Sequence, residues 1–377
     1  MRISRIDVYH IDIPYAKVFR IATAEYPSQP FVIVRIATDD GLEGWGEACP
    51  AHEFTGETGG TVFSIMLEKM GRRLIGKDPS DVEALVVKGL NDIAGAPSAK
   101  AALDVALHDL LGKALGVPLY RLLGGLVRRS FPVTGGATLA SLDETLDKVK
   151  RDIERGIEVL KIKVGEDPEK DAEKIRRVRE VVGDKPIIRV DANQGWVKPR
   201  RAIKAIRLME RYGIELVEQP ILAWDLDGLA EIRRSVDTPI MVDESVHTPI
   251  DVVRVAEKRA ADIVNIKLMK TGGIRIALRV AAVAEAMGLD AYMGSMGETM
   301  IGRAANLHLA LSLDVIKYGD IVAITREWGL VEDVATGLRE ELIDGVLQVV
   351  APSEPGLGVR IKSEVLNKYL VAHRVIK

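Results

Sequence analysis

The stretch EVLKIKVGEDPEKDAEKIRRVREVVGDKPIIRVDAN, residues 158–193, contains two short apolar runs separated by a charged amphipathic segment. Short apolar runs rich in Val and Ile favour buried strands, whereas the segment between them has the spacing of a helix. That segment carries basic residues late and ends at Gly183, as helix C-termini favour. The stretch therefore predicts a strand–helix–strand unit of a parallel sheet.

The same unit recurs along the chain from Phe131 onward. Eight apolar runs alternate with amphipathic segments: FPVTGG (131–136), EVLKIKVG (158–165), PIIRVDAN (186–193), IELVEQP (214–220), TPIMVDES (238–245), DIVNIKLM (262–269), LDAYMGS (289–295) and VIKYGDI (315–321). Eight strand–helix units predict a (β/α)8 TIM-type barrel, and such barrels carry their chemistry at the C-terminal ends of the strands.

The regions on either side of the barrel have a different pattern. Residues 1–125 predict an α+β domain, because two antiparallel strands near the N-terminus precede helical spacing over 58–123. Between those strands, residues 15–30 are polar and are expected to be irregular. The barrel domain is expected over 126–340, and residues 341–377 predict a strand, a turn and a short helix that return to the first domain.

Composition narrows the classes of function. The chain has 377 residues, is 47% hydrophobic and has a formal net charge of −3, which gives no basic field to attract nucleic acid or a membrane surface. Cys49 is the one cysteine, so no intrachain disulfide can form. No apolar stretch is long enough to span a bilayer. We therefore expect a cytoplasmic protein that acts on a small molecule.

Polar residues close the predicted strands in a pattern. Counted along the barrel, the strand ends carry Lys161 and Lys163, then Asp191 and Asn193, then Glu218, then Asp243 and Glu244, then Lys267. A single acidic residue here is often only the N-cap of the next helix. Three successive strands that each end in a carboxylate, bracketed by lysines, instead predict a Mg²⁺ site made by Asp191, Glu218 and Asp243.

The two lysines of LKIKVG, residues 160–165, face the same way on a strand. A barrel has no edge strand, so both ammonium groups need anionic partners. A like charge nearby, together with a metal ion, lowers the pKa of a lysine toward the range of a useful base. We therefore predict Lys163 as an acid/base, Lys161 as its tuning neighbour and as a ligand for a substrate carboxylate, and Lys267 as a second base on the opposite side.

These residues and their surroundings resemble the enolase superfamily, and within it the muconate-lactonizing subgroup. The resemblance rests on the motifs GLEGWGEA (41–48), LYRLLGG (119–125), LKIKVG (160–165), RVDANQGW (189–196), ELVEQP (215–220), PIMVDES (239–245), NIKLMKTGG (265–273), GSMGET (294–299) and PGLGV (355–359). It implies a capping domain over a modified barrel, Mg²⁺ held by the three carboxylates, and Lys163 and Lys267 as the pair of bases. It also implies a homo-oligomer, often an octamer in this subgroup.

The substrate is a small carboxylate whose identity is left open by the residues. In the family, specificity comes from two capping-domain loops and the end of the eighth strand, here residues 15–30, PAHEFTGET (50–58) and YGDIVA (318–323). The first two look like those of dipeptide epimerases, whose Asp-x-Asp at the eighth strand binds an ammonium group. Here Asp320 matches the first position and Val322 occupies the second. The candidate substrate-binding residues are Lys161, Asn193, Glu298, Asp320 and Thr55.

Racemisation or epimerisation of a dipeptide or N-substituted amino acid through an enediolate is the activity that these features favour. A hydroxyproline-like substrate also remains open. Muconate cycloisomerisation and dehydration share the same enediolate step on the same frame. A non-catalytic carboxylate-binding protein is the alternative from another class, and binding alone gives no reason for two opposed lysines.

Overall fold

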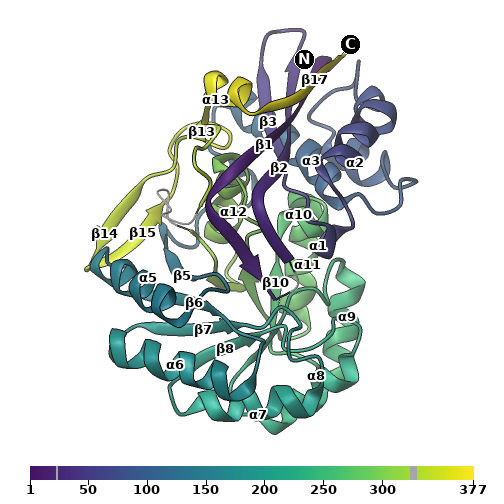
Figure 1. Ribbon diagram of the computed structural model, residues 1–377. Helices are drawn as coiled ribbons and strands as arrows, with labels where there is room; N and C mark the ends of the chain where they lie inside the picture. Colours follow the sequence, from purple (N-terminus) through teal and green to yellow (C-terminus); the bar gives the residue numbers. More distant parts are fainter. Residues whose placement is uncertain (23, 323–328) are drawn as a thin grey trace.

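The computed structural model describes residues 1–22, 24–322 and 329–377. An antiparallel sheet with helices, drawn in purple and blue in Figure 1, lies against a barrel of parallel strands surrounded by helices. Both chain termini lie at the end of the antiparallel sheet that is far from the barrel (Figure 1). Within the described residues, no helix has the length and apolar character needed to cross a membrane.

Eight parallel strands form the barrel, and each of the eight predicted runs overlaps one of them. In chain order they are β5 (Thr134–Ala137), β6 (Val159–Lys163), β7 (Ile187–Asp191), β8 (Ile214–Glu218), β9 (Ile240–Val242), β10 (Ile263–Ile266), β11 (Asp290–Met293) and β12 (Ile316–Gly319). Their order in the sheet follows the chain. Just beyond β12, the Ile321 carbonyl accepts a 2.9 Å hydrogen bond from the Thr134 amide, so the first and last strands meet. The predicted barrel is confirmed.

Helices cover the outside of the barrel: α5 (Leu142–Glu154), α6 (Pro168–Val182), α7 (Pro199–Glu210), α8 (Leu226–Ser235), α9 (Pro249–Lys258), α11 (Ile274–Ala286) and α12 (Met300–Ser312). Side-chain caps such as Ser141 and Asp167 start them, since these oxygens accept the free amide hydrogens of the first turn. Most of these helices bury one face only. All of α12 is buried, because it lies between the barrel and the first domain.

The first domain is built on a four-stranded antiparallel sheet in the order β17-β1-β2-β3. Its strands are β1 (Ile3–Ile21), β2 (Ala24–Thr38), β3 (Glu43–Ala48) and β17 (Leu370–Ile376). The long helix α3 (Pro97–Ala114) packs on β3 at Gly44 and Gly46. A Cβ atom on these glycines would lie 2.1 Å from the Ala106 carbonyl oxygen and 2.0 Å from that of Ala102. Only glycine permits this close approach.

Short elements complete this domain and the C-terminal region. They are α1 (His52–Thr55), α2 (Gly59–Ile65), π-helical turns at Met66–Met70 and Glu83–Lys88, a 3₁₀ turn at Gly71–Arg73, α4 (Leu119–Leu122), β4 (Ser130–Pro132), α10 (Leu268–Thr271), β13 (Ala335–Thr336), β14 (Glu340–Ile343), β15 (Val346–Val350), β16 (Arg360–Ile361) and α13 (Ser363–Lys368). The hairpin β14–β15 pairs with β4, next to the barrel, whereas β17 pairs with β1. The domain boundaries after residues 125 and 340 stay predictions.

The expectation of an irregular stretch over residues 15–30 was wrong. β1 and β2 continue as a paired hairpin through most of it, with Phe19 opposite Tyr26 and Arg20 opposite Glu25. The register shifts between Pro14 and Phe19, and this shift hides the alternation that identifies a strand. The consequence is a long hairpin that reaches over the barrel mouth (Figure 1).

Candidate active site

A cavity of about 220 Å³ lies between the C-terminal ends of the barrel strands and the first domain. From the barrel it is lined by Lys161, Lys163, Asn193, Lys267 and Asp320, among others, and from the first domain by Tyr15, Phe19, Tyr26 and Phe54. Five of the ten predicted site residues therefore share one cavity. The hairpin supplies an aromatic wall, in which the ring centroids of Tyr15 and Phe19 are 5.5 Å apart.

The two lysines of β6 point into the barrel, where carboxylates surround them. The Lys161 ammonium lies 2.5 Å from Glu218 Oε2, 2.7 Å from Asp320 Oδ2 and 3.5 Å from Asp191 Oδ2. The Lys163 ammonium donates to Asp191 Oδ2 at 2.5 Å and to Asn193 Oδ1 at 2.6 Å. These anionic partners explain how a buried strand carries two neighbouring ammonium groups.

Lys267 approaches from the other side of the barrel. It directly follows β10, which lies four places from β6 in the ring of eight strands, so Lys163 and Lys267 come from opposed strands. Its ammonium donates to Asp243 Oδ2 and lies 4.6 Å from the centre of the Phe54 ring. A group in the cavity between the two lysines thus has an amine on either side.

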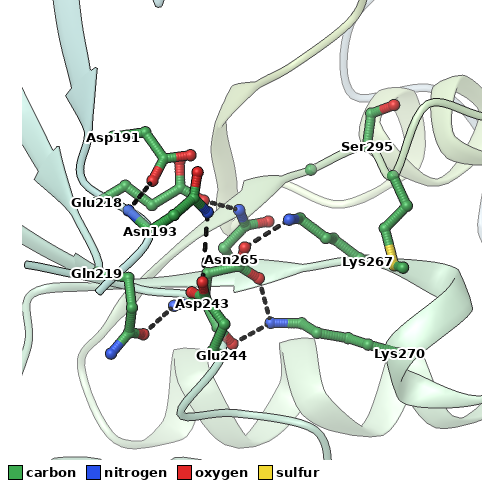
Figure 2. A network of polar contacts seen from close by, with 12 residues as sticks. Asp191, Asn193, Glu218, Gln219, Asp243, Glu244, Asn265, Lys267, Lys270 and Ser295 are labelled. Atoms are coloured by element: carbon green, nitrogen blue, oxygen red, sulfur yellow. Dashed lines mark hydrogen bonds and ion pairs between the residues drawn. The ribbon is translucent and has the colours of Figure 1, made fainter. Parts of the chain in front are cut away.

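The three predicted metal ligands lie in contact with the lysines and are at most 1% exposed. Asp191 and Glu218 are register partners on β7 and β8, and Asp243 follows β9. Figure 2 shows two side chains that hold them in place. Asn265 donates to Glu218 Oε1 at 2.7 Å, and Gln219 Oε1 accepts the amide hydrogen of Asp243 at 2.8 Å (Figure 2).

The electrostatics of this network are dominated by buried negative charge. Burial and the neighbouring Asp191 raise the pKa of Glu218 to about 8, and burial and Asp243 raise that of Glu244 to about 7. Although burial alone would lower it, Asp320 and Glu218 hold the pKa of Lys161 well above its usual value. Against burial, Asp243 and Glu218 likewise raise the pKa of Lys267. The neighbouring carboxylates thus raise the pKa values of Lys161 and Lys267 by more than the repulsion between the two ammonium groups lowers them.

The donor chemistry of the site fits a hard divalent cation. Carboxylates stand at the ends of three adjacent strands, and Glu244 Oε2 is buried without a hydrogen-bond partner. Among the described residues, however, no three acidic, histidine or cysteine side chains are close enough to form a finished metal cage. Lys161 contacts both Asp191 and Glu218, and so takes the place of a cation between them. The residues present therefore fit Mg²⁺ in identity and in charge.

Thr55 and Glu298 do not line the cavity. The Thr55 hydroxyl donates to the Ala51 carbonyl within the short helix α1, and its neighbour Phe54 faces the cavity instead. Glu298 is fully buried and closes a turn, where its Oε2 accepts hydrogen bonds from the Ser295 hydroxyl and the Met296 amide. Of the loops expected to set specificity, Thr23 and Ala323 lie outside the described residues.

Three further residues of the network were not assigned a role from the sequence: Asn265, Tyr292 and Lys270. Asn265 and Tyr292 are single polar residues inside apolar strand runs, and this is the signal that could have identified them. The Tyr292 hydroxyl donates to Asp320 Oδ1 at 2.6 Å. Lys270 belongs to the motif NIKLMKTGG and binds Asp243.

Comparison with known proteins agrees with this fold. Residues 5–124 match the family model "Mandelate racemase / muconate lactonizing enzyme, N-terminal domain", and residues 144–365 match "Enolase C-terminal domain-like". Fold and site together define an isomerase of the enolase superfamily. More narrowly, the chain belongs to the mandelate racemase/muconate lactonizing enzyme family.

Relatives in this family act on several substrates. An L-Ala-D/L-Glu epimerase of Clostridium acetobutylicum is 38% identical over 95% of this chain and 99% of its own. The N-succinyl-L-Arg/Lys racemase of Bacillus cereus is 34% identical over the whole of both chains, and its crystal structure matches with a TM-score of 0.94. A dipeptide epimerase of Cytophaga hutchinsonii, solved with Mg and D-Ala-L-Val, is 29% identical over the whole of both chains, with a TM-score of 0.93.

Proposed function

We propose that this protein is a Mg²⁺-dependent racemase or epimerase that removes and returns the proton α to a carboxylate. The observation that carries the proposal is the placement of Lys163 and Lys267 on opposed strands, facing one cavity. A base on each side of an α-carbon lets one remove the proton while the other supplies it from the opposite face. A single base could not invert the centre in this way.

The other residues divide the remaining tasks. Asp191, Glu218 and Asp243 would hold Mg²⁺, which when bound would supply positive charge for the enediolate. Lys161 and Asn193 orient the substrate carboxylate, since both line the cavity beside Lys163. The hairpin of β1 and β2, together with Phe54, excludes water from the reacting atoms.

Of the two candidate substrate classes, we favour an N-substituted amino acid over a dipeptide. Both oxygens of Asp320 are engaged, Oδ2 by Lys161 and Oδ1 by Tyr292, and Val322 offers no charge next to it. A free ammonium group would have to displace one of these partners, whereas an acylated nitrogen would not. The similarity to the N-succinyl-L-Arg/Lys racemase supports this order, and that to the L-Ala-D/L-Glu epimerase supports the second candidate.

Proton NMR in D₂O tests both levels of the proposal. The enzyme with Mg²⁺ is incubated with dipeptides, N-acyl amino acids, proline derivatives and muconate, and loss of α-proton signals is followed. Exchange of both stereoisomers of an N-acyl amino acid is the expected result. Exchange confined to dipeptides would leave the reaction type intact and reverse the substrate order. Absence of exchange with every compound would exclude the racemase and epimerase functions.

The homo-oligomeric state, with an octamer as the assembly that the subgroup suggests, and the cytoplasmic location stay part of this proposal. Light scattering on the purified protein measures the first, and fractionation of the source cells measures the second.

A further inference from the structure

Lys270 is a buried charge that the proposed reaction does not use. Its side chain has no exposure and does not line the cavity. Its ammonium contacts one residue on two atoms, donating to Asp243 Oδ1 at 2.7 Å and to the Asp243 backbone carbonyl (Figure 2). Removing an ammonium group from water is energetically unfavourable, so a buried lysine at this position calls for a functional explanation.

The backbone places Lys270 and Lys267 on the same carboxylate. Lys267 precedes the single turn α10, and Lys270 follows three residues later, with its amide bonded to the Lys267 carbonyl at 3.1 Å. Residues three apart in a helical turn lie on the same face. The turn ends at Gly272 and Gly273, with φ of +96° and +109°, which are conformations that favour glycine. The backbone conformation of the motif KTGG, residues 270–273, thus fixes the position from which the Lys270 side chain extends.

The two lysines hold different oxygens of Asp243. Lys267 takes Oδ2 from the side of the cavity, and Lys270 takes Oδ1 from inside the protein. The Asp243 amide is held separately by Gln219. Because Oδ1 is bonded to Lys270 and the Asp243 amide to Gln219, rotation of the carboxylate away from Lys267 would break the hydrogen bond to Lys270. Oδ2 therefore remains presented to the Lys267 ammonium, which lines the cavity.

We infer that Lys270 is a positioning residue, which orients Asp243 and through it keeps Lys267 aimed at one face of the substrate. The inference rests on the proposed two-base function, because it concerns the base on one side only. Lys163 has its own partners, Asp191 and Asn193, and no contact with Asp243 among the described interactions. Loss of Lys270 therefore affects the two stereoisomers unequally, whereas a general loss of stability affects both alike.

The experiment compares Lys270→Met, which keeps the length and removes the charge, with Lys270→Arg, which keeps the charge. Lys113→Met is the matched control, since Lys113 pairs with the buried Asp109 at 2.7 Å in α3, away from the cavity. Deuterium exchange is measured at saturating Mg²⁺, separately from each stereoisomer of the substrate found for the parent enzyme. Mg²⁺ affinity is measured by calorimetry without substrate, and folding by circular dichroism.

Lys270→Met is expected to slow exchange by about 10²-fold from one stereoisomer and by far less from the other, since a misplaced catalytic group costs about that much. Mg²⁺ affinity is expected to fall about 10-fold to 100-fold, because outer partners of metal ligands have effects of this size. Lys270→Arg should recover part of both losses, and Lys113→Met should change neither.

Equal loss from the two stereoisomers, or unchanged Mg²⁺ affinity in Lys270→Met, would overturn the inference. If Lys270→Met does not fold, the same comparison of stereoisomers in Lys270→Arg decides, and equal loss there overturns it as well. Failure of the proposed function is a separate result, since it appears as absence of exchange in the parent enzyme with every substrate offered.

Discussion

Tyr292 lies inside the barrel and contacts Asp320, a residue that lines the cavity. Its side chain is fully buried in β11, its hydroxyl donates to Asp320 Oδ1 at 2.6 Å, and its ring centre is 5.6 Å from the Lys161 ammonium. We predict that Tyr292→Phe lowers stability by about 2 kcal/mol, because a hydrogen bond to a charged acceptor is lost. Exchange should slow equally from both stereoisomers, since Lys161 serves the carboxylate that they share.

Urea unfolding and exchange kinetics check this prediction. Tyr318→Phe is the control, because its ring stacks on Tyr292 at 6.5 Å while the bond between Tyr292 and Asp320 stays intact. A strong preference for one stereoisomer in Tyr292→Phe would contradict the role of Lys161 as a carboxylate ligand.

His308 makes the stability of the protein depend on pH. It lies fully buried in α12, where Nδ1 accepts the Tyr120 amide hydrogen at 3.1 Å and Nε2 donates to the Leu357 carbonyl at 3.2 Å. Burial lowers the pKa of His308 to about 4. Between that value and about 6.5, the unfolded state binds the proton and the folded state does not, so stability falls as the pH falls.

The expected loss from this one group is about 2 kcal/mol between about pH 7.5 and pH 5. His308→Gln has no such titration, so its unfolding midpoint in urea should depend less on pH than that of the parent. An unchanged pH dependence in the variant would show that other groups are responsible.

At the scale of elements, the start of α12 is capped from the other domain. Glu47 of β3 accepts hydrogen bonds from the Thr299 amide at 2.9 Å, the Gly302 amide at 3.1 Å and the Thr299 hydroxyl. Glu47→Ala leaves these buried donors without an acceptor, and we predict a loss of about 3 kcal/mol. Glu47→Gln keeps one acceptor oxygen and should lose less, as thermal unfolding will measure. Equal, small losses in both variants would mean that water replaces the carboxylate.

The barrel strands could be predicted from the sequence, whereas the continuation of the β1–β2 hairpin through residues 15–30 could not. Runs such as PIIRVDAN are bounded by helix caps and turn residues, so local pattern and global fold agree. The stretch around Phe19 and Tyr26 depends on a register shift, which no local pattern encodes. Likewise, the lysines and carboxylates could be found as strand ends, but the partners of Tyr292 and Lys270 depend on which strands become neighbours.

At the scale of the whole molecule, helix α3 joins the two domains through buried carboxylates. Asp104 accepts the Ile274 amide hydrogen at the start of α11 in the barrel. Asp109 ties β3 of its own domain to the C-terminal region, since it accepts the amide hydrogens of Trp45 and Leu357 at 2.9 and 2.8 Å. The cavity has walls from both domains. A ligand bound in the barrel should therefore stabilise the molecule as a whole, not only the barrel.

Metal removal tests this coupling. After treatment with a chelator, added Mg²⁺ should raise the melting temperature of the whole protein in one transition, with a gain of about 2.7 kcal/mol at 100 times its dissociation constant. Glu218→Gln should abolish the gain, because a buried carboxylate between Asp191 and Asp243 is lost. Glu215→Gln is the matched control on the same strand, since Glu215 pairs with Arg189 and does not line the cavity. If Glu218→Gln keeps the full Mg²⁺ gain, the ion binds elsewhere and the proposed ligand set is wrong.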